Sequence, residues 1–379
     1  MNIYLFILGL VLFIFLIIAH EFGHFLAARR NGVNVEEFGL FFPPKIWSRR
    51  MKSGYNLSFN ALPLGGFVRL KGEHDADTGK GSFGAASLWA KIKIMLAGIT
   101  MNLLVAFIIF TFLALVGIPQ IINNQFTVKS DTHITKQKVI IDEVEPNSPA
   151  SKAGLQKGDV ITAIGPKNGK IVYLESTSSL PTITSANAGK KVDVIFTNNS
   201  GKTESKIITL RSSSEVAKSQ STSHPIGYLG IGTSSKGNPY SFQKSTWSAP
   251  IVALGLMKQI TILTFQGLGS AVNSLLHGNP GKASNTVTGP VGVVKILKNG
   301  SVLGYQFILF IVALISLSLA IINVLPIPAL DGGRLFFTLV PRILTGKPIR
   351  QRTEEIINAT GLIFLLMLIT VVTFNDIFK

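Results

Sequence analysis

Four stretches of the chain are long and apolar enough to cross a lipid bilayer, and this limits the fold more than any other feature. A helix of about 20 apolar residues spans a hydrocarbon core of ~30 Å. The four stretches cover residues 3–28, 94–118, 303–325 and 355–374. Hydrophobic residues make up 47% of the chain and charged residues only 15%, which is typical of membrane proteins. We therefore predict a polytopic α-helical membrane protein with four transmembrane helices.

The basic residues predict how these helices are oriented. Lysine and arginine concentrate in the links at residues 29–93 and 326–354, while the start of the chain has neither. Basic links stay in the cytoplasm, so both termini are expected outside and the first span is expected to be an uncleaved anchor. The net charge of +17 also raises nucleic acid as a partner. We favour anionic lipid headgroups, because no nucleic-acid-binding motif is present.

Between the second and third spans lies a segment of a different character. Residues 125–233 contain short β-like runs, Ser/Thr-rich loops and frequent glycines. The stretch SPASKAGLQKGDVI, residues 148–161, resembles a bacterial, circularly permuted PDZ domain, in which a short helix starting at Ala150 leads through a glycine turn into a strand. The later GYLGI, residues 227–231, is similar to the loop and strand of the PDZ peptide groove. The resemblance implies one extracytoplasmic PDZ domain with a groove for peptides.

The segment that follows is predicted to be an amphipathic helix. Residues 245–276 are largely apolar, begin with helix-capping residues and include Lys258 and Gln266. We predict that this helix lies at the outer membrane surface or against the helix bundle. A fifth membrane span is the alternative.

A hairpin is predicted in the first cytoplasmic link. Residues 55–70, YNLSFNALPLGGFVRL, alternate polar and apolar positions, with turn signals at Pro63 and Gly65–Gly66. The simplest interpretation is a surface hairpin. An edge strand beside an active site could instead bind an extended peptide by strand addition.

His20, Glu21 and His24 form the pattern H-E-x-x-H near the end of the first span. Ionisable groups inside a membrane helix are costly and usually functional. Residues four apart share one helix face, so both imidazoles can bind one zinc ion while Glu21 acts as general base. The alternative is a chance motif at a cytoplasmic helix end, with histidines bonded to backbone or headgroups.

A catalytic zinc site needs a third protein ligand, and the chain has no cysteine, so that ligand must be His, Asp or Glu. Asp331 is the best candidate, because it is the only acidic residue between Glu215 and Glu354 and follows the third span at the depth expected for the two histidines. Pro326 and Pro328 break the helix there. Unwound backbone at membrane depth occurs where it lines a cavity, and its free amides and carbonyls could bind a substrate strand.

These motifs together resemble the site-2 protease family of intramembrane zinc metalloproteases, and in particular its regulator-of-sigma-E protease branch. HEFGH, AGITMN and NVLPIPALDGG occur in that order in the first, second and third spans. The resemblance implies that His20, His24 and Asp331 bind Zn²⁺ and that Glu21 is the catalytic base. It also implies that the substrate contacts a set of loop and hairpin residues, namely Asn323, Pro326, Pro328, Leu64, Gly65 and Gly66.

The same resemblance implies the substrates and the location. The expected substrates are single-pass transmembrane proteins whose outer domain another protease has removed, for example anti-sigma factors or signal-peptide remnants. The expected location is the bacterial cytoplasmic (inner) membrane, with the PDZ domain outside and the active site near the cytoplasmic side. The predicted domains are a first membrane half, a PDZ domain, a helix with its connecting loop, and a second membrane half, at residues 1–118, 122–235, 242–300 and 301–379.

Two other functions use the same features. A metal or proton transporter could employ the His, Glu and Asp cluster as a relay, but such proteins typically contain inverted repeats, and the two halves of this chain show none. A peptide-binding protein with a membrane anchor would explain the PDZ-like segment. A peptide-binding function would not explain why potential metal ligands lie in two separate spans.

Overall fold

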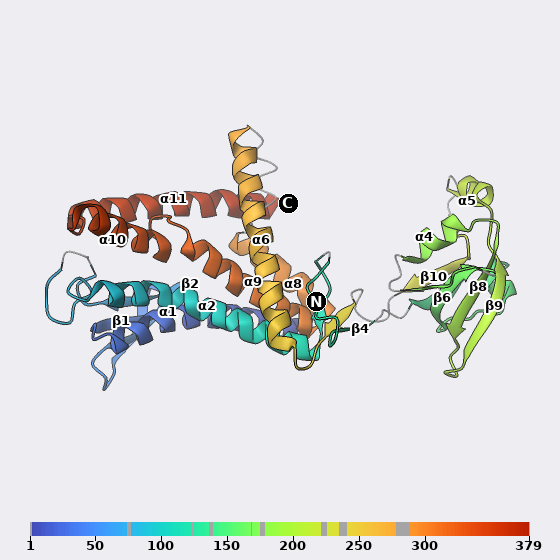
Figure 1. The fold of residues 1–379 in the computed structure, drawn as a ribbon, viewed down its shortest axis with the longest axis horizontal. Coiled ribbons are helices and arrows are strands. Elements are labelled where there is room, and N and C mark those ends of the chain that lie inside the picture. The colour runs from blue at the N-terminus through green and yellow to red at the C-terminus, as the bar shows by residue number, and fades with distance from the viewer. Residues whose placement is uncertain are drawn as a thin grey trace. The chain divides into compact units, whose positions relative to one another are not determined.

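The computed structural model divides the chain into two compact units (Figure 1). The membrane unit comprises residues 1–116, 126–128 and 246–379, and the β unit comprises residues 117–125 and 129–245. The structure describes residues 2–378, except for several short segments at 74–76, 123, 136–138, 168, 175–178, 221–225, 235–240 and 278–288. The predicted loop after residue 277 falls in the last of these segments.

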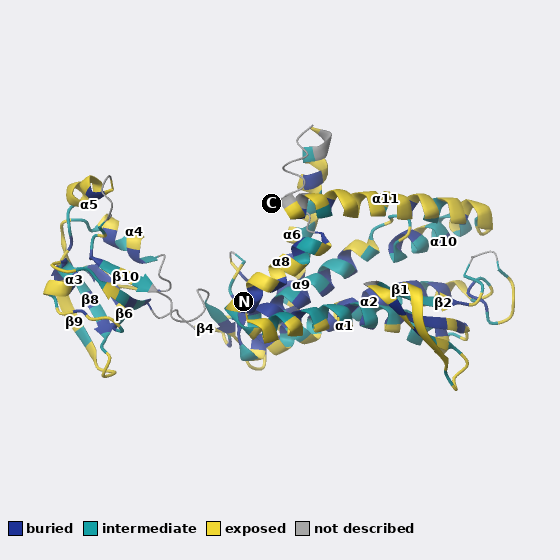
Figure 2. Cartoon of the chain, turned by 180° about the vertical axis from the view of Figure 1, so that it is seen from behind, coloured by how far each residue is buried: buried dark blue, intermediate teal, exposed yellow. Residues whose placement is uncertain are grey.

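Four long helices of the membrane unit match the four predicted spans, with ends that differ by a few residues. They are α1 (Ile3–Arg30), α2 (Leu88–Val116), α9 (Tyr305–Val324) and α11 (Gln351–Phe378). Large apolar side chains are exposed on all four, and α11 is exposed along most of its length (Figure 2). Water does not stabilise such a surface, whereas a lipid environment does.

α6 (Ala249–Leu276) is helical as predicted, and its length and composition also permit a membrane span. Five of the described helices therefore meet the requirement for spanning, whereas four were predicted. α6 packs on α2 and α9, and it runs across α2 in Figure 1. Two further helices were not expected from the sequence, α8 (Pro290–Leu303) and α10 (Asp331–Thr345).

The link between α1 and α2 forms a β ribbon, but its pairing differs from the predicted hairpin. β1 (Val35–Arg50) pairs antiparallel with β2 (Asn56–Leu70), so the strands are joined at residues 51–55. Pro63 and Gly65–Gly66 lie inside β2 rather than in the hairpin connection. The prediction was wrong because β1 contains two consecutive prolines, which normally interrupt a strand.

The ribbon folds back on itself. Residues 37–40 of β1 have partners on both sides, at 56–59 and at 66–69. Within the described chain, residues 66–70 of β2 pair with β1 alone. This end of β2 is therefore an edge strand of the ribbon.

The β unit is built on a sheet with the strand order β10-β5-β6-β8-β9, and β7 also pairs with β6. These strands are β5 (Val139–Val144), β6 (Val160–Pro166), β7 (Val172–Tyr173), β8 (Lys191–Thr197), β9 (Thr203–Thr209) and β10 (Ile231–Ser234). The helices are α3 (Pro149–Lys152), α4 (Ser179–Ala186) and α5 (Ser213–Ser219). A smaller sheet joins β3 (Ile118–Pro119), β11 (Phe242–Lys244) and β4 (His133–Thr135).

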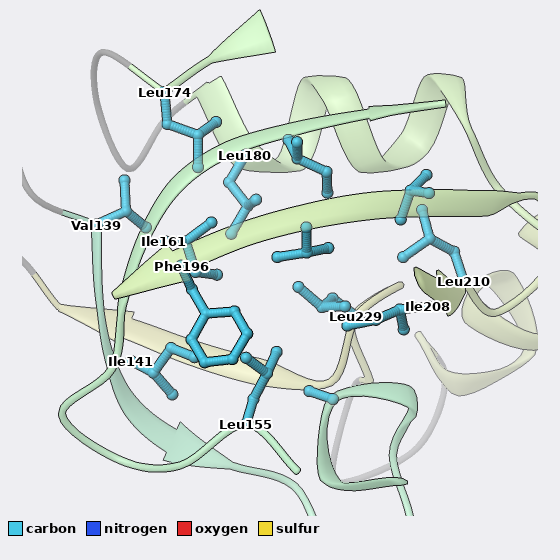
Figure 3. Packing of buried hydrophobic residues seen from close by; sticks show 14 residues of the cluster. Val139, Ile141, Leu155, Ile161, Leu174, Leu180, Phe196, Ile208, Leu210 and Leu229 are labelled. Atoms are coloured by element: carbon cyan, nitrogen blue, oxygen red, sulfur yellow. The ribbon is translucent and has the colours of Figure 1, made fainter. Parts of the chain in front are cut away.

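The local elements predicted for this unit are present. Ser148 caps α3 by accepting a hydrogen bond from the backbone of Ser151 at 3.1 Å, and Asp159 directly precedes β6. A buried apolar cluster fills the space beside the sheet (Figure 3), including Ile141, Ile161 and Phe196. The unit therefore has its own core.

Candidate metal centre

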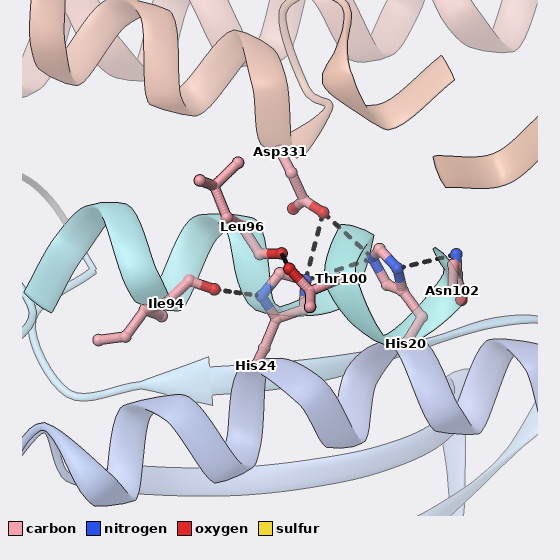
Figure 4. A network of polar contacts seen from close by, with 7 residues as sticks. All are labelled: His20, His24, Ile94, Leu96, Thr100, Asn102 and Asp331. Atoms are coloured by element: carbon pink, nitrogen blue, oxygen red, sulfur yellow. Dashed lines mark hydrogen bonds and ion pairs between the residues drawn. The ribbon is translucent and has the colours of Figure 1, made fainter. Parts of the chain in front are cut away.

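His20 and His24 lie one turn apart on the face of α1 that packs against α2. Their Nε2 atoms are 3.2 Å apart (Figure 4). Both side chains are largely buried, with 14% and 13% of their surface exposed. The spacing of four residues thus brings the two imidazoles to one point, as the sequence predicted.

Asp331 joins them from a position about 300 residues later in the chain. Its Oδ2 atom is 3.2 Å from Nε2 of His20 and 3.3 Å from Nε2 of His24. Among the described residues, these three form the one cluster of His, Asp or Glu side chains whose ligand atoms all lie within 4.8 Å of one another. The predicted third ligand is therefore the residue that the fold places beside the histidines.

Two features of the backbone direct Asp331 toward α1. The chain between α9 and α10 is extended at Leu325 and left-handed at Ala329, with φ of 72°. α10 then begins at Asp331 itself, so its carboxylate extends from the helix start. A Cβ at Gly332 would lie 2.6 Å from the carbonyl oxygen of Asn323, so glycine permits the close turn between the two helices.

Arg334 fixes α10 one turn further on. Its Nη2 donates to the carbonyl oxygen of Glu73 at 2.7 Å, and its guanidinium lies 5.0 Å from the centre of the Phe83 ring. Phe83 is itself almost fully buried. The segment after β2 therefore holds the helix that carries Asp331.

The three side chains fit a bound zinc ion. His24 Nδ1 lies 2.8 Å from the carbonyl oxygen of Ile94, which can only accept, so Nδ1 carries the proton and Nε2 presents a lone pair. Asp331 Oδ2 is buried and makes no hydrogen bond with the described residues. Lone pairs that converge in a buried site need a cation between them. Two imidazoles and one carboxylate are also a known catalytic ligand set for zinc, which leaves a fourth position open.

Gly98 on α2 provides the space for this cluster. A Cβ at this position would lie 2.6 Å from Cε1 and 2.7 Å from Nε2 of His20, and it would also overlap Nε2 of His24. α2 is closely packed here, with Ile94 and Ile99 buried. The glycine therefore allows both imidazoles to rest on α2.

Glu21 lies on the same turn as His20, next to the edge of β2. A Cβ at Gly66 would come within 3.0 Å of Glu21 Cγ, and the backbone amide of Val68 is within hydrogen-bonding reach of the Glu21 carboxylate. The predicted general base and the edge strand of the β ribbon thus meet beside the three predicted ligands.

The other predicted residues lie around this centre. Asn323 is half-buried in the last turn of α9, and Pro326 and Pro328 lie between α9 and α10. Gly65 and Gly66 lie in β2, as does the backbone of Leu64, whose side chain is outside the described structure.

Asn102 is the last residue of the AGITMN motif, but its contact with the metal centre was not predicted from the sequence. Its Nδ2 atom lies 3.2 Å from Nδ1 of His20, on the side of the ring away from Asp331 (Figure 4). Ile94, Gly98 and Asn102 are four residues apart, so they share the face of α2 that meets the histidines. This spacing was available in the sequence, but it has meaning only once α2 is known to pack on α1.

Comparison with known proteins identifies a family that fits this centre. The family model for Peptidase family M50 matches residues 8–368. A Campylobacter jejuni protein named "Putative zinc metalloprotease Cj1068" is 32% identical over 96% of this chain and 90% of its own length. A Clostridium perfringens protein with the same general name is 30% identical over 98% of both chains. The "Probable protease eep" of Enterococcus faecalis is 26% identical over 97% of both.

The chain belongs to peptidase family M50, the site-2 protease family. It is a zinc metalloprotease, as predicted, and its long apolar helices make it a multi-pass membrane protein. The alternative of a metal or proton transporter is not favoured by any of these relatives.

Proposed function

We propose that the protein is an intramembrane endopeptidase that hydrolyses peptide bonds within transmembrane segments of single-pass membrane proteins. The observation that carries this proposal is the convergence of His20, His24 and Asp331 between helices that are apolar enough to lie in a bilayer. Helices as apolar as these are expected around the metal centre of a membrane protease, not of a soluble one.

In the proposed mechanism the three ligands hold the zinc ion and Glu21 moves the proton. Bound zinc supplies Lewis-acid activation of water and of the scissile carbonyl. Glu21 takes a proton from the attacking water and delivers it to the leaving amine. Its place beside the ligands, on a turn of α1 that the edge of β2 covers, suits this role.

A substrate helix must unwind before its backbone can reach the site, and we propose that two segments stabilise the extended form. The edge strand of β2, which begins at Gly66, and the adjoining Leu64 and Gly65 would offer backbone groups for strand addition. The segment with Pro326 and Pro328, together with Asn323, would bind the substrate from the opposite helices. Gly66 adjoins Glu21, so a strand paired there would pass the catalytic base.

The membrane topology that we propose places both termini outside and the metal centre near the cytoplasmic face. The start of α1 and the end of α11 lie at one end of the membrane unit, and β1, β2 and α10 lie at the other (Figure 1). This agrees with the basic residues of the cytoplasmic links. Because α6 runs across α2, we retain its placement along the outer surface or against the bundle. We propose the bacterial cytoplasmic (inner) membrane as the location.

We also propose that residues 122–235 form an extracytoplasmic PDZ domain, followed by the helix and loop of residues 242–300. Residues 1–118 and 301–379 are then the two membrane halves. The order of helix, glycine turn and strand at residues 148–161 supports this assignment. The domain would bind peptides at the loop before β10. The substrates that we propose are membrane proteins whose outer domain another protease has already removed, such as anti-sigma factors or signal-peptide remnants. These shortened proteins would reach the metal centre.

The variant Glu21→Gln tests the proposed reaction. We expect it to bind zinc as the wild type does and to cleave a model single-pass transmembrane peptide in proteoliposomes at least about 100-fold more slowly, since general-base catalysis contributes 10²–10⁴-fold. Glu36→Gln is the matched control, because Glu36 is an exposed carboxylate on β1. Full cleavage by Glu21→Gln would overturn the proposal, and zinc flux without any cleavage would favour a transporter instead.

A further inference from the structure

If His20 binds zinc through Nε2, its other ring nitrogen, Nδ1, carries a proton and needs a hydrogen-bond acceptor. His24 has its acceptor, the carbonyl oxygen of Ile94. His20 Nδ1 faces the side-chain amide of Asn102 at 3.2 Å, with Nδ2 as the nearer atom. The oxygen of that amide, Oδ1, is buried and has no hydrogen-bond partner among the described residues.

The identity of the amide atom decides whether His20 can bind a metal. If Nδ2 donates to Nδ1, the imidazole carries its proton on Nε2, the atom that faces Asp331 and His24. A protonated Nε2 cannot be a ligand. If the amide is rotated by half a turn, Oδ1 accepts from a protonated Nδ1 and Nε2 presents a lone pair. Nitrogen and oxygen of such an amide are assigned from the hydrogen-bond network, and only the rotated form leaves Nε2 of His20 free to bind a metal.

Asn102 lies where α2 packs against α9. The hydroxyl of Ser316 on α9 donates to the backbone carbonyl oxygen of Asn102 at 2.8 Å. Both residues are almost fully buried, with 1% and 0% of their surface exposed. A buried amide needs a hydrogen-bond partner, and among the described residues the ring of His20 lies within reach of this one.

We propose that Asn102 is a positioning residue that fixes His20 in its metal-binding tautomer by accepting a hydrogen bond from Nδ1 through Oδ1. Together with the carbonyl of Ile94, it makes α2 the source of both acceptors behind the histidine ligands. Acceptors of this kind orient metal-bound imidazoles and raise their basicity, and their loss typically weakens metal binding 10–100-fold. The inference rests on the proposed zinc ligation by His20.

The test is zinc affinity, measured by competition with a chromophoric chelator on the full-length protein in detergent. We expect Asn102→Leu to bind zinc about 10–100-fold more weakly than the wild type. Asn102→Asp keeps an oxygen acceptor and should bind at least as tightly as the wild type. Ser316→Ala is the matched control, because it removes a contact to the same residue without changing the acceptor, and it should remain close to the wild type.

A purely structural role would give a different pattern. Wild-type affinity in Asn102→Leu, or equal losses in Asn102→Leu and Asn102→Asp, would overturn the inference. If Asn102→Leu does not fold, Asn102→Ser replaces it, because its hydroxyl is too short to reach the ring. The proposed zinc ligation fails separately, if the wild type does not bind zinc or if His20→Ala binds it as tightly as the wild type.

Discussion

Gly98→Ala is the substitution for which the structure makes the sharpest prediction. The added methyl group would lie 2.6 Å and 2.7 Å from two ring atoms of His20 and closer still to Nε2 of His24. Carbon atoms in contact need about 3.5 Å, so one or both rings must move by roughly 1 Å. Zinc–nitrogen distances tolerate only about 0.2 Å. We therefore expect zinc affinity to fall by about 100-fold or more, which corresponds to about 2.7 kcal/mol.

The assay is chelator competition for zinc affinity, combined with cleavage of a transmembrane peptide and thermal unfolding of the metal-free protein. The matched control is Gly269→Ala on α6, where no atom lies within 4 Å of the added Cβ. This control should leave zinc affinity and cleavage unchanged and slightly stabilise the helix, by up to about 1 kcal/mol. Wild-type zinc affinity and activity in Gly98→Ala would refute the geometry of the centre.

Two further predictions concern regions away from the metal. Burial raises the pKa of Glu37 in β1, but the hydrogen bond from Lys45, 2.7 Å away, and other nearby partners outweigh it and hold the pKa below its usual range. The ribbon should therefore lose stability as the pH falls from about 5 through that lowered pKa, and Glu37→Gln should flatten this loss in amide hydrogen exchange at acidic pH. Asp376 accepts hydrogen bonds at 2.9 Å from two backbone amides at the start of α8. Asp376→Ala should lower stability by about 1 kcal/mol in thermal unfolding, while Asp376→Asn, which keeps an oxygen acceptor, should lose less.

The convergence of His20, His24 and Asp331 could be predicted from the sequence because it follows local rules. The spacing of His20 and His24 requires only a helix, and Asp331 is identified because the chain has so few other acidic residues near the expected depth. The four helices α1, α2, α9 and α11 follow equally directly from the length and composition of their segments, whereas α6 also meets these criteria and was predicted to lie at the surface or against the bundle. The structure brings these residues together at one point, as predicted.

The parts that sequence reasoning missed depend on contacts between distant segments. The stretch Asp331-Gly332-Gly333 favours a turn, because glycine is a poor helix former, yet it begins α10. A side chain at Gly332 would meet the carbonyl of Asn323 on α9, so the glycine serves the packing of two helices. The pairing of β1 with β2 and the contact of Asn102 with His20 likewise depend on neighbours that no local pattern reveals.

The central claim is that Asp331 and the two histidines hold one zinc ion between distant parts of the chain. The most direct test is the zinc content of the purified protein, measured for the wild type and for Asp331→Ala after dialysis against a weak chelator. We expect about one zinc per chain in the wild type and far less in Asp331→Ala, with the helical circular dichroism unchanged. An equal zinc content in the two proteins would contradict the account.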